Sequence, residues 1–98
     1  VYDSAKGAVE VMTRNMAYEL APHGITVNCV APGNIAERPG AEPAAWWPRA
    51  TARIPFGRLG RAEDIAAAVV FFCLPESEFT TGQTLLIDGA HDAYLPEF

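Results

Sequence analysis

Apolar side chains recur every three to four residues over residues 2–21, a spacing that predicts an amphipathic α-helix. The stripe that they share consists of Ala5, Ala8, Val9, Met12, Met16 and Leu20. Pro22 and Gly24 end this helix, because proline cannot continue the hydrogen-bond ladder and glycine permits a turn. Residues 25–30 then form a short β-branched run between glycine and proline, which predicts a strand.

A second helix and a second strand are expected near the carboxyl terminus. Residues 62–74 are apolar on nearly every side and carry Glu63 and Asp64 in the first turn, where acidic groups suit the helix dipole. Pro75 ends this helix. Residues 84–88 form a continuous apolar run, which is typical of a parallel strand that is covered on both faces.

The connection between these two halves, residues 31–61, is long and rich in proline and glycine. Loops of this length in compact domains are usually functional lids or disordered segments, and we expect a lid over residues 34–61. A short helix around residues 43–53 fits the pattern, although Pro48 is expected to bend or split it.

The order helix, strand, lid, helix, strand predicts a parallel α/β layered fold. Two parallel strands make a poor sheet, and the apolar helix over residues 62–74 needs neighbours that this chain does not contain. We therefore expect the 98 residues to be incomplete as a stand-alone domain, with further strands upstream or in other copies. The chain starts at Val1, in the middle of an expected element, which also indicates the back end of a longer protein.

Composition and charge narrow the classes of function. Half of the chain is apolar and its formal net charge is −5, which is typical of a globular protein and argues against a nucleic-acid or polybasic membrane binder. No apolar run is long enough to span a membrane. Cys29 and Cys73 lie far apart in apolar stretches, so we expect buried free thiols and a reducing, cytoplasmic compartment.

Tyr2 and Lys6 are the residues with the clearest chemical use. They are four positions apart, so a helix places them on one face. An ammonium group beside a phenol favours the phenolate, which lets the tyrosine exchange a proton with a carbonyl or alcohol oxygen near neutral pH. Taken alone, such a pair is more often a solvated helix face.

Four motifs in a fixed order favour the catalytic interpretation of this pair over a solvated helix face. They are Tyr2-Asp3-Ser4-Ala5-Lys6, the segment 25–33 ending in Pro32-Gly33, the segment 55–66 (PFGRLGRAEDIA) and the segment 81–89 (TGQTLLIDG). This succession closely resembles the carboxyl-terminal part of the short-chain dehydrogenase/reductase family. The resemblance covers nearly the whole chain and implies part of a doubly wound, parallel-sheet Rossmann-type domain over residues 1–98.

The resemblance also implies roles for individual residues. Tyr2 would be the catalytic acid/base, with Lys6 as its partner and as a ligand of the ribose of the cofactor. Pro32 and Gly33 would form the turn that follows the strand beneath the nicotinamide, a location that agrees with the crevice rule for open α/β sheets. Ile35 would offer backbone groups to the carboxamide.

The function that the resemblance implies is an NAD- or NADP-dependent oxidoreductase that interconverts an alcohol and a carbonyl. Its substrate would be a small molecule, with a 3-oxoacyl group on a carrier as one open choice. The helix over residues 62–74 and the strand over residues 84–88 would build the interface of a homo-oligomer, a dimer or a tetramer. The isolated 98 residues are expected to be inactive, and the alternative is a truncated, non-catalytic remnant that only self-associates or binds a full-length relative.

The chain departs from the family pattern at three positions. Glu37 replaces a threonine that contacts the cofactor, and its carboxylate would repel a pyrophosphate. Ala62 replaces a common proline and Ala90 a common glycine, with little expected consequence for the chemistry. The glycine-rich phosphate turn, the serine and the asparagine of the family all precede the tyrosine, so they lie outside these 98 residues.

The remaining candidates are weaker. His23 and His91 lack a second ligand nearby, which favours a surface role over metal binding. Trp46 and Trp47 suit either packing or stacking on a substrate. Residues 38–61 hold five arginines against the single Glu42, a balance that fits an anionic substrate, an acidic carrier protein or merely a solvated surface.

Overall fold

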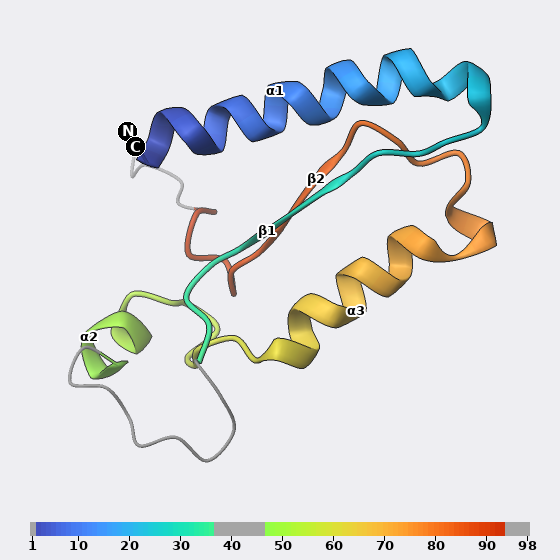
Figure 1. Cartoon of the computed structure of the whole chain (residues 1–98). Helices are drawn as coiled ribbons and strands as arrows, with labels where there is room; N and C mark the ends of the chain where they lie inside the picture. Colours follow the sequence, from blue (N-terminus) through green and yellow to red (C-terminus); the bar gives the residue numbers. More distant parts are fainter. Residues whose placement is uncertain (1, 37–46, 94–98) are drawn as a thin grey trace, which may run out of the picture. The chain divides into compact units, whose positions relative to one another are not determined.

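The computed structural model describes residues 2–36 and 47–93 (Figure 1). Its elements are α1 (Tyr2–Leu20), β1 (Cys29–Pro32), α2 (Trp47–Ala52), α3 (Ala62–Cys73) and β2 (Thr84–Ile87), with 3-10 helices η1 (Ala21–His23) and η2 (Pro75–Ser77). The order confirms the predicted α/β class, and the two strands form a parallel pair that makes up only part of a Rossmann-type sheet.

The chain divides into two compact units. The first unit comprises Val1–Val30 with Ala68–Leu85, and the second comprises Ala31–Ala67 with Leu86–Phe98. Both strands and α3 contribute residues to each unit.

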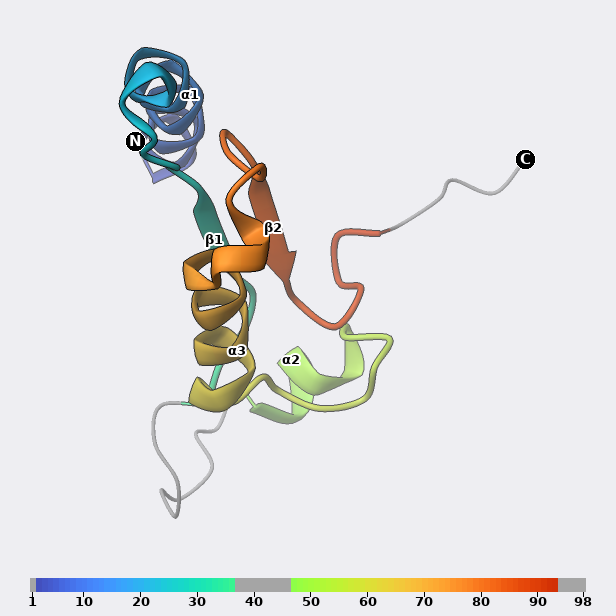
Figure 2. The same ribbon diagram turned by 90° about the vertical axis from the view of Figure 1, so that its right-hand side faces the viewer.

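In the first unit, α1 confirms the predicted helix but buries a different line of residues. Thr13 and Ala17 are buried, whereas Val9, Met12 and Met16 of the predicted stripe are exposed. The Thr13 hydroxyl donates a hydrogen bond to the Val9 carbonyl at 2.8 Å, so its burial leaves no polar group unsatisfied. In Figures 1 and 2, α1 lies to one side of the start of both strands.

The first strand begins later than predicted, at Cys29 rather than at residue 25. Before it, Val27 donates its N–H to the Thr81 hydroxyl at 3.0 Å and accepts the N–H of Gly82 at 2.7 Å. The Asn28 side chain donates to the Thr80 carbonyl at 3.0 Å and accepts the N–H of Gln83 at 3.1 Å. Side chains and a turn therefore replace the sheet ladder over residues 25–28.

The helix α3 confirms the second predicted helix and its stop at Pro75. The Asp64 carboxylate accepts the backbone N–H of Arg61 at 2.8 Å, which satisfies a donor at the start of the helix. Leu74 is extended, with φ −71° and ψ 144°, and Pro75 opens η2. Of α3 only Ala68 is buried, so much of its apolar surface is uncovered by the described residues, as expected for an incomplete domain.

In the second unit, Ile54 and Leu59 are buried and form the core. The short helix α2 falls within the predicted range, and the expectation that Pro48 bends or splits a longer helix stays a prediction. Pro48 lies within α2. The other end of the predicted helix, residues 43–46, lies outside the described residues.

Candidate functional site

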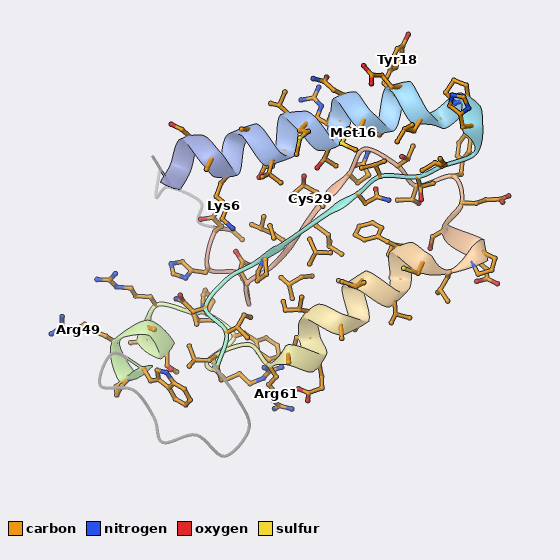
Figure 3. All side chains as sticks on the ribbon, in the orientation of Figure 1. Lys6, Met16, Tyr18, Cys29, Arg49 and Arg61 are labelled. Atoms are coloured by element: carbon orange, nitrogen blue, oxygen red, sulfur yellow. The ribbon has the colours of Figure 1, made fainter. Side chains whose placement is uncertain are left out.

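The predicted proton-transfer pair lies at the start of α1, in the first unit. Tyr2 and Lys6 occupy positions one helical turn apart, which the helix geometry places on the same face. The Lys6 side chain is exposed and is labelled in Figure 3. The side chain of Tyr2 lies outside the described part of the structure, so its role stays a prediction.

Tyr18 provides a contrast on the same helix. It is 86% exposed, and Figure 3 shows it pointing away from the strands, whereas Met16 points toward them. Tyr2 and Tyr18 lie at opposite ends of α1, so only Tyr2 is one helical turn from Lys6. Tyr18 is not part of any of the family motifs.

The predicted cofactor floor lies in the second unit, at the end of β1. Pro32 is the last residue of the strand, and Gly33 follows it with its N–H donating to the Ile87 carbonyl at 2.9 Å. Gly33 is exposed and lies directly beside Asp88. Because glycine has no side chain, the backbone at this strand end is bare. A bare, exposed backbone at the carboxyl end of a parallel strand is the kind of location at which α/β sheets bind ligands.

Ile35 pairs with Gly60 in an isolated parallel bridge. The two hydrogen bonds of this bridge join the Gly60 N–H to the Asn34 carbonyl and the Ala36 N–H to the Gly60 carbonyl, both at 2.9 Å. The N–H and the carbonyl of Ile35 itself take no part in the bridge. Both groups thus fit the predicted role of hydrogen-bonding a carboxamide.

The structure therefore brings Pro32, Gly33 and Ile35 together in one unit, while Tyr2 and Lys6 belong to the other. Glu37, the departure expected to repel a pyrophosphate, and Trp46 lie outside the described residues. Trp47 is half-buried at the start of α2.

An ion pair that the sequence analysis missed organises the loop before α3. Arg58 donates Nη1 to Oδ2 of Asp64 at 2.9 Å, and its guanidinium lies 5.2 Å from the centre of the Phe56 ring. The hydrogen bond from Arg58, followed by that from the Arg61 backbone, lowers the pKa of Asp64. The same hydrogen bond raises the pKa of Arg58. Both residues stand in the quoted motif, but the spacing of six positions carries no helical signal that predicts their pairing.

A second missed feature is the pair of hydrogen bonds that the Asp88 side chain makes in the turn after β2. The Asp88 carboxylate accepts the N–H of Ala90 and the N–H of Asp92, each at 3.0 Å. The Asp-Gly pair at residues 88–89 signals such a turn, because aspartate side chains hydrogen-bond the backbone that follows them. His91 lies in this turn, within the second unit.

Two pockets lie within the second unit. One of about 320 Å³ is lined in part by Asn34, Phe56, Asp64 and Ile87. The other, of about 200 Å³, is lined by Asn34, Arg49, Ala50, Arg53 and His91. His91 was expected only to be a surface residue in a patternless tail, so its position beside two arginines is new.

The cysteine prediction is confirmed in one respect and wrong in another. Both thiols are free, but Cys73 is exposed and Cys29 only half-buried. Cys73 is exposed because it ends α3, whose apolar surface the described residues leave largely uncovered.

Two properties of the described residues bear on other classes of function. In residues 2–36 and 47–93, no helix has the length and apolarity needed to cross a membrane. Within the same ranges, no three histidine, cysteine, aspartate or glutamate side chains are grouped as they would be around a metal ion. The cytoplasmic location stays a prediction.

Comparison with known proteins identifies relatives along the whole chain. Residues 1–90 match the family described as Enoyl-(Acyl carrier protein) reductase. The chain is 44% identical over 96 residues to the short-chain reductase protein NovJ of Streptomyces niveus, a match that covers 90% of this chain and 37% of that protein.

Two solved structures share the fold. Acetoin dehydrogenase YohF from Salmonella typhimurium is 40% identical with a TM-score of 0.79, and the match covers 99% of this chain and 37% of that one. A short-chain dehydrogenase from Leptospira borgpetersenii with bound NAD+ is 35% identical with a TM-score of 0.81, over 92% of this chain and 34% of that one. The chain thus spans little more than a third of the length of these relatives, as expected for a carboxyl-terminal portion. It belongs to the short-chain dehydrogenase/reductase family.

Proposed function

We propose that these residues form part of an NAD- or NADP-dependent oxidoreductase that interconverts an alcohol and a carbonyl. The observation that carries this proposal is the position of Tyr2 and Lys6, one turn apart at the start of α1, in a chain of this family. Residues 1–98 are then the carboxyl-terminal part of one Rossmann-type domain, with residues 34–61 as its substrate lid.

Proton transfer falls to the residues of α1. The Tyr2 phenol gives its proton to the carbonyl oxygen as that oxygen becomes a hydroxyl, and takes a proton from the hydroxyl in the reverse direction. The Lys6 ammonium stabilises the negative charge that the phenol acquires. NAD or NADP, when bound, supplies or accepts the hydride.

The residues at the end of β1 fit the cofactor. Gly33 presents exposed backbone, and the bridge between Ile35 and Gly60 leaves the peptide groups of Ile35 outside its hydrogen bonds. Pro32, Gly33 and Ile35 would hold the nicotinamide, and Lys6 would hold the ribose hydroxyls.

The test is turnover by the longest polypeptide that the reading frame around these residues encodes. It is assayed with NADH and with NADPH against acetoin, because the Salmonella relative is titled an acetoin dehydrogenase, and against a 3-oxoacyl thioester. Loss of the acid/base in Tyr2→Phe should lower kcat by at least about a hundredfold. Tyr18→Phe, on the same helix, should leave kcat unchanged. Absence of both turnover and cofactor binding in the parent polypeptide would refute the proposal.

The second candidate function is a non-catalytic remnant that associates with itself or with a full-length relative. It is favoured by the exposed apolar side chains of α3, among them Val69, Val70 and Phe71. The enzyme hypothesis also expects this surface to form the interface of a dimer or tetramer, so cofactor turnover separates the two functions.

Sedimentation tests the association itself. Val70→Asp should shift the protein toward monomer, because a charge would enter the interface. Val11→Asp is the matched control, since Val11 is 54% exposed on α1 and Val70 is 57% exposed on α3. A monomeric parent protein would contradict both forms of the association hypothesis.

A further inference from the structure

The smaller pocket of the second unit has an unusual charge balance. Of the side chains that line its 200 Å³, those of Arg49 and Arg53 carry positive charge, and His91 and Asn34 add polar groups. Among the residues that the structure describes, no carboxylate lines it. The positive character of the 38–61 segment, noted from the sequence, is therefore partly gathered around one cavity.

Neither arginine is neutralised by the described residues. The ion pair found in residues 2–36 and 47–93 joins Arg58 to Asp64, and neither Arg49 nor Arg53 takes part in it. Arg49 lies on α2 and Arg53 lies in the turn that follows it, and both residues line this pocket. An oxyanion held between two guanidinium groups accepts charge-assisted hydrogen bonds from both.

The opposite wall of the pocket is held in place by hydrogen bonds. His91 donates its backbone N–H to the Asp88 carbonyl at 3.2 Å, and the Asp88 carboxylate fixes Ala90 and Asp92 on either side. Across the pocket, the Arg53 N–H donates to the Ala50 carbonyl at 3.1 Å, which continues the last turn of α2. The backbone that carries the two arginines and the histidine is therefore held by hydrogen bonds.

We propose that Arg49, Arg53 and His91 form a binding site for a small oxyanion, a carboxylate or a phosphate carried by the substrate. This assignment to the substrate rests on the proposed oxidoreductase function, whereas the binding site itself does not. A concave pocket of this volume holds a single anionic group with a few carbon atoms. An acidic protein surface is too large to enter this pocket and would instead contact arginines outside it. One of these is Arg61, which is exposed and is labelled, like Arg49, in Figure 3.

Anion binding is measured as stabilisation against urea, in the full chain and without any cofactor. A ligand that binds the folded state raises the free energy of unfolding even when the folded state is marginal. The probes are malonate and inorganic phosphate, which separate a carboxylate from a phosphate site, with uncharged malonamide as the control at equal ionic strength. We expect one anion to stabilise the chain in a saturable manner and malonamide to have no effect.

Variants of the arginines test whether the anion binds in this pocket. Arg49→Gln with Arg53→Gln should weaken the apparent affinity by at least about tenfold. Arg61→Gln removes the same type of charge outside the pocket and should change the affinity by less than about twofold. Equal loss in both variants, or no stabilisation by either anion, would overturn the site.

Turnover separates this inference from the proposed function. Tyr2→Phe should abolish turnover and leave anion binding intact. In the active polypeptide, the double arginine variant should raise KM for a carbonyl substrate that bears the favoured anionic group more than it raises KM for acetoin. An enzyme that turns over acetoin but binds no anion would retain the proposed function and refute the oxyanion site.

Discussion

Gly33 and Asp88 approach so closely that no side chain fits between them. A Cβ atom placed on Gly33 would lie 2.7 Å from Cβ and 2.9 Å from Cα of Asp88. The second atom belongs to the backbone, so the clash cannot be relieved by turning a flexible side chain. The strand end that we assign to the cofactor therefore depends on a glycine.

Gly33→Ala should lower the free energy of unfolding by about 1–3 kcal/mol, because the β-carbon would push the two chain segments apart. Gly7→Ala is the control with the opposite sign. Gly7 lies in α1 with no atom within 4 Å of its missing Cβ, so alanine should stabilise the helix by about 0.5–1 kcal/mol. Urea unfolding of both variants checks the pair, and a neutral Gly33→Ala would contradict the close approach.

The ion pair between Arg58 and Asp64 predicts a loss of stability in acid. The pKa of Asp64 in the folded chain is lowered by the Arg58 hydrogen bond, below the ordinary value of about 3.9 that it has when unfolded. The contribution is therefore complete above that ordinary value and is lost as the pH falls through the lower, folded-state pKa.

Asp64→Asn removes the titrating group while keeping an oxygen that can accept the Arg61 N–H. The free energy of unfolding is measured against pH for both proteins. The difference between the parent and Asp64→Asn should be constant near neutrality and should shrink as the pH falls below about 4. A difference that stays constant down to the most acid point would show that Asp64 does not contribute through its charge.

Ala90 has a backbone conformation that suits glycine. Its φ is 72°, in the left-handed region that costs an alanine about 1–2 kcal/mol. Ala90→Gly should therefore raise the free energy of unfolding by about 0.5–1 kcal/mol, after the greater freedom of glycine in the unfolded chain is subtracted. Ala93→Gly, three residues on and without a positive φ, should lower stability instead. Two losses of similar size would indicate that Ala90 is unstrained.

The helices were the most predictable part of the fold. Proline and glycine near Leu20 and at Pro75 mark their ends, and these signals act through neighbours in the sequence. The start of β1 was not predictable, because it depends on partners such as Thr81 that lie far along the chain. The line of burial on α1 was also missed, since it is set by what packs against Thr13 and Ala17.

Prediction of the candidate site was similarly uneven. Pro32, Gly33 and Ile35 come together because they lie at or just after the end of one strand, so a short motif locates all three. The meeting of His91 with Arg49 and Arg53 has no such signal, because the residues are about forty positions apart and only the folded chain joins them. The consequence of Ala90 for stability likewise became visible only with its backbone angle.

The hydrogen bond from Val27 to Thr81 also has a kinetic meaning, since 54 residues separate its ends. Each turn of α1 forms quickly, because it joins residues that are close in the sequence. The bond between Val27 and Thr81 forms only when the intervening segment closes into a loop, which costs conformational entropy. We therefore expect the meeting of the two strands to be the slow event in folding, and shortening the segment between them should accelerate it.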